Sequence, residues 1–274
     1  MKHVVITGST RGIGLGLAEA FLDLDCSVTI SGRSLDDVDG VVRELSGQHS
    51  SDYLLGLACD VRDPVQVQAL WDASKDRFKV VDIWINNAGL SGPQLAAWIM
   101  PPDKAREIIE TNLLGEIYGS MVAVREMITQ GHGAIYNMEG MGSDGRMHAG
   151  LTYYGTSNSG RHYLNQSLIK ETQDTPLIIG TLRPGMVVTD LLTKQYEDRP
   201  EQWERDKRIF NILADRVETV TPWLAAKILD NDKSGVCISW SSRWKIMGRF
   251  LTSPFTRRNV FGESADNAGK VNQS

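Results

Sequence analysis

The fold is decided by the stretch Thr7-Gly8-Ser9-Thr10-Arg11-Gly12-Ile13-Gly14, whose glycines are spaced G-x-x-x-G-x-G. A short apolar run, residues 3–7, leads into it, and an amphipathic stretch, residues 15–24, follows. Glycines let the backbone turn tightly and approach a pyrophosphate, which the free N–H groups at the start of a helix attract. The Gly-Lys-Ser/Thr of a nucleoside-triphosphate loop is missing. We therefore predict a dinucleotide-binding loop; the alternative is a tight turn without a ligand. The residues expected to contact the ligand are Gly8, Ser9, Arg11, Gly12, Ile13 and Gly14.

Short apolar runs alternate with amphipathic stretches along the chain. The runs have the length of strands and are mostly apolar on both faces, as strands of a buried parallel sheet are. This alternation predicts an α/β fold, a Rossmann-type, doubly wound, parallel seven-stranded sheet flanked by helices. The expected strands are residues 3–7, 27–31, 53–58, 82–86, 134–138, 177–182 and 236–239. The expected helices are residues 15–24, 34–45, 65–78, 102–111, 112–129, 153–171 and 222–229.

Composition excludes several classes of protein. The chain has 274 residues, of which 41% are hydrophobic and 23% charged, which is typical of a globular domain and not of a disordered one. A net charge of −5 argues against a nucleic-acid partner. The three cysteines are scattered, which indicates free thiols in a reducing compartment and no metal site. No membrane span or cleavable leader is recognisable, so we expect a cytoplasmic protein.

Residues 1–240 are predicted to form one NADP-binding Rossmann domain. Within it, residues 190–217 are strongly charged with interspersed apolar residues, and they follow the sixth predicted strand directly. Two interpretations stay open for this segment: a solvated surface helix, or a lid over the substrate. The C-terminal extension, residues 241–274, is basic as far as residue 262. It is interpreted either as a helix packed on the core or a neighbouring subunit, or as a surface helix that touches an anionic membrane or a large apolar substrate.

The end of the second predicted strand bears on the cofactor. An acid at this place usually holds the 2′-hydroxyl of NAD, whereas a 2′-phosphate needs a cation. The chain has Arg33 here, and the first acid comes only at Asp36. Arg11 in the glycine loop is a second cation, and a guanidinium suits a phosphate. We therefore predict NADP(H) as the cofactor, against the alternative that Arg33 is only a solvated surface charge.

Four further blocks occur in an order that resembles the short-chain dehydrogenase/reductase family. They are Asp60-Val61, Asn86-Asn87-Ala88-Gly89, Asn112, and Pro184-Gly185-Met186-Val187-Val188-Thr189. The resemblance covers about residues 1–240. It implies that Asp60 and Val61 contact adenine and that Asn112 holds a water of a proton relay. It also implies cofactor contacts for Asn87, Ala88, Gly89, Pro184, Gly185, Val187 and Thr189.

A narrower resemblance lies in residues 82–89, 137–146 and 184–192. These stretches look like the chlorophyll b reductases of plants and their bacterial relatives, a branch that reduces a formyl group on a large tetrapyrrole. A bacterial relative that acts on another substrate is equally compatible with the stretches. The resemblance implies a substrate class without establishing it.

The family resemblance implies a tyrosine that transfers the proton, a lysine four residues later and a serine about thirteen residues earlier. Tyr154 is the better match for the tyrosine, and Tyr153 is the alternative. The lysine position holds Asn158, whose amide can hydrogen-bond the nicotinamide ribose but carries no charge. Gly140 stands where the serine pattern would end, so Ser143 is predicted to bind the carbonyl oxygen. Arg146 and His148 in the same loop either line the pocket or face solvent.

Three explanations for Asn158 stay open: a deliberate alteration that inactivates the protein, a natural divergence toward slow catalysis or sensing, or replacement by another cation. Arg161 is the nearest cation, three positions further along the same helix face. The more ordinary interpretation of Arg161 is a salt bridge on the helix face or at a subunit interface. Loss of a unit charge about 4 Å from the tyrosine would remove about 4 kcal/mol at an effective dielectric of 20, before solvent relaxation.

The chain is therefore predicted to be an NADP(H)-dependent carbonyl reductase or alcohol dehydrogenase that transfers hydride to an aldehyde or ketone. The expected catalytic residues are Asn112, Ser143, Tyr154 and Asn158. The alternative is a catalytically inactive dinucleotide-binding sensor or scaffold. Residues 112–129 and 153–171 carry apolar side chains on more than one face, so a homodimer or homotetramer is expected, as in the family.

Overall fold

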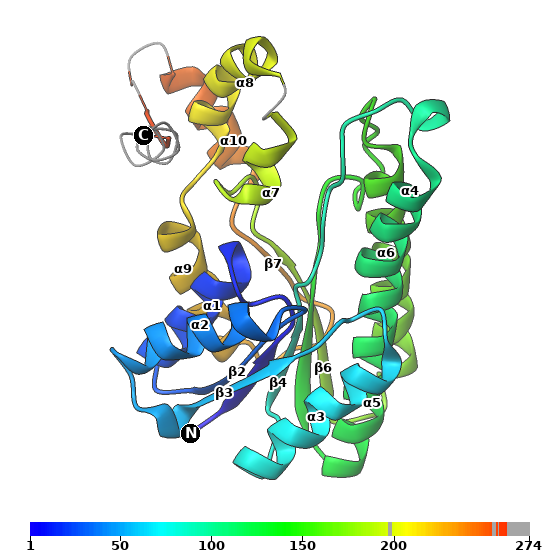
Figure 1. Cartoon of the computed structure of the whole chain (residues 1–274), viewed down its shortest axis with the longest axis vertical. Coiled ribbons are helices and arrows are strands. Elements are labelled where there is room, and N and C mark those ends of the chain that lie inside the picture. The colour runs from blue at the N-terminus through cyan, green and yellow to red at the C-terminus, as the bar shows by residue number, and fades with distance from the viewer. Residues whose placement is uncertain (197–198, 254–255, 257, 262–274) are drawn as a thin grey trace.

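A seven-stranded parallel sheet forms the centre of the computed structural model, which describes residues 1–196, 199–253, 256 and 258–261 (Figure 1). The strand order is β3-β2-β1-β4-β5-β6-β7. The strands are all parallel, but β2 and β3 are added on one side of β1, and β4 to β7 on the other. A crevice therefore opens beyond the carboxyl ends of β1 and β4. The strands are β1 His3–Ile6, β2 Ser27–Gly32, β3 Leu54–Ala58, β4 Ile83–Asn86, β5 Gly133–Met138, β6 Leu177–Arg183 and β7 Cys237–Ser239. The predicted fold class is confirmed.

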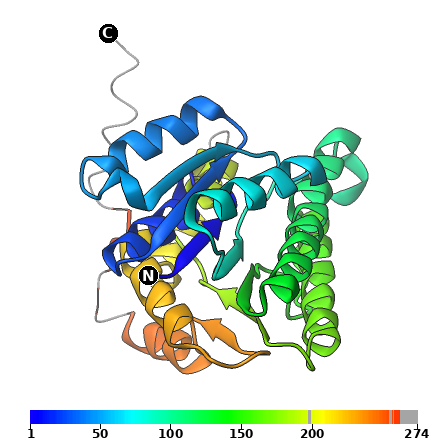
Figure 2. The same ribbon diagram turned by 90° about the horizontal axis from the view of Figure 1, so that it is seen from below.

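Helices cover both faces of the sheet, as Figure 2 shows end-on. One apolar cluster joins Val4 and Ile6 of β1 to α1, α2 and α9. The other joins Val5 and Trp84 to α3 and α5. Because side chains alternate along a strand, neighbouring residues of β1 enter opposite clusters. Both faces of the strands are therefore buried against helices. This explains why the strands could be recognised in the sequence as continuous apolar runs. The covering helices are α1 Gly12–Asp23, α2 Leu35–Ser46, α3 Pro64–Phe78, α5 Gly115–Gln130, α6 Thr152–Glu171 and α9 Val217–Asp230.

Three predicted helix boundaries need correction. Helix α1 begins at Gly12, inside the glycine loop, and not at residue 15. The predicted helices 102–111 and 112–129 are one run, because α4 Pro102–Ile109 continues through a π-helical turn, Glu110–Leu114, into α5. Helix α9 begins five residues before Pro222, which lies inside it. A proline removes one helical hydrogen bond, and α9 tolerates this because it packs along α1 in the core.

The C-terminal extension is fastened to the segment that follows β6. That segment contains α7 Asp190–Thr193 and α8 Pro200–Leu213, and the extension contains α10 Arg243–Thr252. Arg249 and Arg258 both bind the Asp215 carboxylate, at 2.7 and 2.8 Å, and both donate to carbonyls near the end of α8. Figure 1 shows α8 and α10 together beyond one edge of the sheet. The described residues of the extension thus include two that fasten it to the protein, and residues 254–255, 257 and 262–274 lie outside the described part.

Aromatic side chains hold the same segment together. Tyr196 and Trp203 lie 5.5 Å apart between ring centres, and Phe261 of the extension lies 4.9 Å from Trp203. Phe210 of α8 completes the cluster. The described residues of the segment 190–217 thus carry a small apolar core of their own, and the lid over the substrate stays a prediction. No helix among the described residues is long and apolar enough to cross a bilayer.

His3 gives the fold a testable dependence on pH. Its ring is buried, lies between the hydroxyls of Ser27 and Thr29 and stacks on Phe78. Burial lowers the pKa of His3 from 6.5 to about 3. The unfolded chain therefore takes up this proton first as the pH falls, so the contribution to stability is complete above about pH 6.5 and is lost below it.

We predict that wild type loses about 2 kcal/mol of unfolding free energy through His3 between pH 7 and pH 5. His3→Gln should lose correspondingly less over that interval. Urea unfolding at the two pH values measures the difference, and His132→Gln, at an exposed histidine, is the control. Equal pH dependence in wild type and His3→Gln would contradict the prediction.

Candidate active site

The glycine loop lies against the segments that follow β4 and β6. Gly8 and Gly12 have positive φ angles of 64° and 57°, which favour glycine. A Cβ on Gly8 would stand 2.8 Å from the Ala88 Cα, and one on Gly12 would stand 3.3 Å from the Thr189 methyl. The loop and the start of α1 thus form a backbone cradle with no room for larger side chains. This cradle fits the pyrophosphate of a dinucleotide.

Two predicted cofactor contacts have other functions. Ser9 is fully buried, and its hydroxyl donates to the Ile6 carbonyl at 2.8 Å, so its side chain lies within the sheet and not in the cradle. The Asn87 amide donates to the carbonyls of Thr7 and Gly8, both at 2.9 Å. Asn87 therefore locks the glycine loop to the end of β4. The sequence did not distinguish such bracing residues from ligand contacts.

Cations gather where the adenosine end of a dinucleotide would lie. The side chain of Arg33 is 53% exposed and stands 3.7 Å from Glu107 of α4. Arg11 is also exposed, 4.0 Å from Asp190. Asp60 accepts a two-pronged contact from Arg62, which lowers the pKa of that carboxyl. Arg33 and Arg11 remain accessible to an anion because both pairings are long and exposed.

Four other predicted cofactor residues differ in their access to the cleft. Val61 is buried under Gly115, and Val187 is buried and bridged to Asp215. Gly185 has a φ of 75°, and a Cβ there would meet Ser241. Gly89 lies beside the Asn112 amide, and a Cβ on Gly89 would stand 3.4 Å from Asn112 Oδ1. These residues shape the walls of the crevice through backbone, and the side chains of Val61 and Val187 point into the protein.

Tyr154 stands in the first turn of α6, directly over the end of β5. A Cβ added to Gly140 would overlap the Tyr154 hydroxyl and lie 2.9 Å from the Asn158 amide nitrogen. The neighbouring Tyr153 points elsewhere, since its hydroxyl donates to the Ala97 carbonyl at 3.2 Å. The geometry therefore favours Tyr154 over Tyr153 as the proton donor. It also explains Gly140, because a side chain there would push the tyrosine aside.

Ser143 lies close to Gly140, as predicted, but its proton is engaged. Its buried hydroxyl donates to the Gly140 carbonyl at 2.7 Å. Only its lone pairs are available until that bond is exchanged for one to a substrate oxygen. Arg146 and His148 in the same loop are exposed, and both interpretations of them stay open.

The Asn112 side chain braces the site. It is buried in the π-helical turn, and its amide donates to the Leu90 carbonyl at 2.8 Å and to the Ser157 hydroxyl at 3.1 Å. Its amide oxygen accepts from the Leu90 N–H. Both amide hydrogens are therefore used in joining three loops and helices. The relay role that the family resemblance implies for Asn112 stays a prediction.

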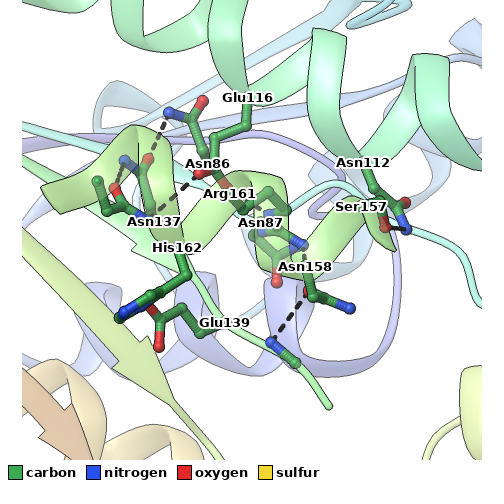
Figure 3. Close-up of polar contacts among 12 residues, drawn as sticks. Asn86, Asn87, Asn112, Glu116, Asn137, Glu139, Ser157, Asn158, Arg161 and His162 are labelled. Atoms are coloured by element: carbon green, nitrogen blue, oxygen red, sulfur yellow. Dashed lines mark hydrogen bonds and ion pairs between the residues drawn. The ribbon is translucent and has the colours of Figure 1, made fainter. Parts of the chain in front are cut away.

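Asn158 is also placed differently from the expectation. It is fully buried, and its amide oxygen accepts from the Gly140 N–H at 3.1 Å and from Arg161 Nη1 at 3.2 Å (Figure 3). Its amide nitrogen donates to the Tyr154 carbonyl at 3.0 Å. No part of this amide faces the crevice to hold a ribose. Asn158 instead ties α6 to the end of β5.

Sequence reasoning missed the buried polar cluster around Glu116 and Arg161 (Figure 3). Arg161 and Glu116 form a buried ion pair, with Arg161 Nε 2.5 Å from Glu116 Oε2. Burial raises the pKa of Glu116, and the charge of Arg161 opposes that rise. A second pairing joins Glu139 to His162 and Arg183. The only signal in the sequence was an acid within the apolar helix 112–129, which does not reveal its partner.

Exposed apolar side chains stand on the segments after β4, β5 and β6, which leave the carboxyl ends of these strands. We call this set the apolar rim: Trp98, Ile99, Met141, Met147 and Leu191. Trp98 is 88% exposed and Met147 is 96% exposed. Apolar side chains gathered around a binding crevice are typical of a site for an apolar ligand. Among the described residues no group of His, Cys, Asp and Glu is arranged to hold a metal ion.

A family model described as short chain dehydrogenase matches residues 2–200. The chain belongs to the short-chain dehydrogenase family. It is therefore an oxidoreductase of that family.

Curated relatives place the chain near the chlorophyll(ide) b reductases. The chloroplastic chlorophyll(ide) b reductase of Oryza sativa subsp. japonica is 36% identical over 82% of this chain and 66% of its own length. A probable chloroplastic chlorophyll(ide) b reductase of Arabidopsis thaliana is 31% identical over 96% of this chain. The chain spans about half the length of this second relative, 55%. The chloroplast location of these relatives contradicts the cytoplasmic location that we expected.

Solved structures share the fold. A complex of actinorhodin polyketide ketoreductase with NADPH has a TM-score of 0.78 at 22% identity, over 87% of this chain and 95% of its own. The 3-ketoacyl-(acyl-carrier-protein) reductase of Brucella melitensis with NADH has a TM-score of 0.74 at 23% identity, over 87% and 96% of the two chains. Neighbours of this fold bind either nicotinamide cofactor.

The close approach at Gly140 generates a prediction. Gly140→Ala should lower kcat about tenfold to a hundredfold, because the new methyl would displace the Tyr154 hydroxyl from its working position. Turnover is followed by loss of reduced nicotinamide absorbance, with cofactor binding measured separately. Gly155→Ala is the matched control, since its Cβ would meet nothing within 4 Å. A Gly140→Ala variant as active as Gly155→Ala would refute the assigned place of Tyr154.

Proposed function

We propose that the chain is an NADPH-dependent reductase of a carbonyl group on a large apolar molecule. The observation that carries this proposal is the apolar rim, which stands on loops where ligands of such sheets bind. A small polar carbonyl compound would not cover side chains as exposed as Trp98 and Met147. The relatives named chlorophyll(ide) b reductases support a formyl-bearing tetrapyrrole as the substrate class.

Arg33 supports the choice of NADPH. Its guanidinium lies at the end of β2, has no acid of that strand beside it, and is exposed enough to meet a 2′-phosphate. Glu107 is the group with which a phosphate would compete. When bound, the cofactor supplies a hydride from the nicotinamide ring to the carbonyl carbon. The glycine cradle and Asn87 hold the loops that would position it.

Tyr154 would donate its proton to the carbonyl oxygen as negative charge develops there. Ser143 would turn its hydroxyl from the Gly140 carbonyl to the same oxygen, and so bind it. Both hydroxyls come from segments that Asn158 ties together, which limits how far the two oxygens can separate. The rim would exclude water from the covered substrate.

The second candidate is a catalytically inactive dinucleotide-binding protein. The observation that favours it is the uncharged, buried Asn158 at the position of the family's lysine. Both candidates bind a dinucleotide, and only the reductase converts a carbonyl compound.

Two further expectations stay predictions. A homodimer or homotetramer would use the outer faces of α5 and α6, where Met121 and Tyr163 are exposed. Peripheral membrane contact of the C-terminal extension would use α10, where Trp244, Phe250 and Leu251 are exposed.

The cofactor choice predicts a selective effect of Arg33→Ala. This variant should weaken NADPH binding about tenfold or more and leave NADH binding nearly unchanged, because only the 2′-phosphate loses a charged hydrogen bond. Quenching of tryptophan fluorescence by each nucleotide measures both affinities. Arg43→Ala, at an exposed arginine on α2, is the control. Equal weakening for the two nucleotides, or tighter binding of NADH than NADPH by wild type, would reject NADPH.

The substrate class predicts a difference between large and small aldehydes. Wild type should oxidise NADPH with chlorophyllide b, and the double variant Trp98→Ser, Met147→Ser should raise KM for it about tenfold. Turnover of a small aldehyde should change little. Val65→Ser, an equally exposed apolar site on α3, is the control. Binding of NADPH without turnover of either aldehyde would favour the inactive protein.

A further inference from the structure

Arg161 is a buried cation that is hydrogen-bonded to Asn158, whose amide lies near the Tyr154 hydroxyl. The side chains of Arg161 and Glu116 are 5% and 2% exposed. A charge so deep in the protein needs a partner, and Glu116 supplies it to Arg161 Nε. Nη1 donates to Asn158, and Nη2 is buried without a hydrogen-bond partner. The guanidinium thus directs one N–H group at the residue that stands where the family has its lysine.

The contacts of Asn158 connect this cation to the reacting groups. The amide oxygen that accepts from Arg161 also accepts from the Gly140 N–H. The hydroxyl of Tyr154 and both polar atoms of Asn158 surround the place where a Gly140 side chain would begin. A short uncharged side chain at position 158 therefore lets the guanidinium approach the tyrosine from behind.

We propose that Arg161 is the cation of this active site. It is held by Glu116, acts through Asn158 and supplies the positive charge that a lysine at position 158 would supply. The site accepts only one cation, either Arg161 or a lysine at position 158. This inference rests on the proposed reductase function. Arg161 touches neither substrate nor cofactor, so it is a positioning residue. Its charge stabilises the tyrosine as the proton leaves it.

The exclusion of a second cation follows from the surroundings. Glu116 is already paired with Arg161, and its other oxygen accepts from Asn165. The next acid, Glu139, is bound by His162 and Arg183. The other described polar partners of the cluster are neutral: the amides of Asn86 and Asn137, the Ser120 hydroxyl and the Trp84 indole N–H. A lysine at position 158 would therefore face Arg161 with no free carboxylate between them, and like charges in such a place repel strongly.

The test is a cycle between position 158 and the ion pair. In the neutral-pair variant, Glu116→Gln with Arg161→Met, both charges are removed together so that neither remains buried alone. We expect its kcat to fall about tenfold or more while KM for NADPH changes little. Asn158→Lys added to the neutral pair should restore kcat. Asn158→Lys in wild type should not raise kcat, and it should lower Tm by about 4 °C or more.

The matched control is Glu139→Gln with Arg183→Met. It removes a second ion pair, at the ends of β5 and β6, that is not hydrogen-bonded to Asn158, and it should leave kcat within a small factor of wild type. Should the neutral pair fail to fold, Arg161→Lys with Glu116 retained decides the matter. This variant keeps the charge and should keep most of kcat, whereas Arg161→Gln should not.

Three results would overturn the inference. The first is a folded neutral-pair variant with wild-type kcat. The second is a tenfold loss in Arg161→Lys equal to that in Arg161→Gln. The third is an additive cycle, in which Asn158→Lys lowers Tm equally with and without the ion pair. If wild type binds NADPH but turns over no carbonyl compound, the reductase proposal fails, and the Tm cycle alone still decides whether positions 158 and 161 compete for one cation.

Discussion

Close backbone packing of the glycine loop against the end of β4 is the constraint on which the site depends. A Cβ on Gly8 would stand 2.8 Å from the Ala88 Cα, and the Asn87 amide ties the two segments together. This contact holds β1 and β4 side by side with their carboxyl ends level. It lies at the point where the order of strand addition reverses. The cradle, the tyrosine and the apolar rim all take their positions from that edge.

Behind the tyrosine, buried amides and one ion pair form a continuous polar chain. It runs from Asn86 through Asn137, Asn165, Glu116 and Arg161 to Asn158. In a dry interior each such group needs its partner, so no single member changes without cost to the next. Asparagine at position 158 is therefore best understood as one part of an arrangement that includes Gly140, Glu116 and Arg161. Considered alone in the sequence, it suggested only a lost lysine.

The face that would meet substrate is built from segments added after β4, β5 and β6. The segment after β6 is not left loose, because Asp215 binds Arg249 and Arg258 and aromatic rings close around Trp203. The basic composition of the C-terminal extension is explained in part by this contact. The arginines neutralise one buried carboxylate and cap the carbonyl end of α8. The rim then stands on supported loops, and its apolar side chains remain uncovered.

The sequence by itself determined the sheet and the glycine loop, and it singled out Tyr154 as the candidate proton donor. These features are local: strands with two dry faces are continuous apolar runs, and Gly8 and Gly12 mark a turn that only glycine enters easily. Tertiary structure decided what surrounds the tyrosine. Arg161 and Glu116 lie 45 positions apart in the sequence, and the side-chain amide of Asn112 is hydrogen-bonded to Leu90 and Ser157. Those partners meet only when α5 and α6 pack together, because the hydrogen bonds and charge pairs of a buried side chain depend on distances in space that spacing along the chain does not encode.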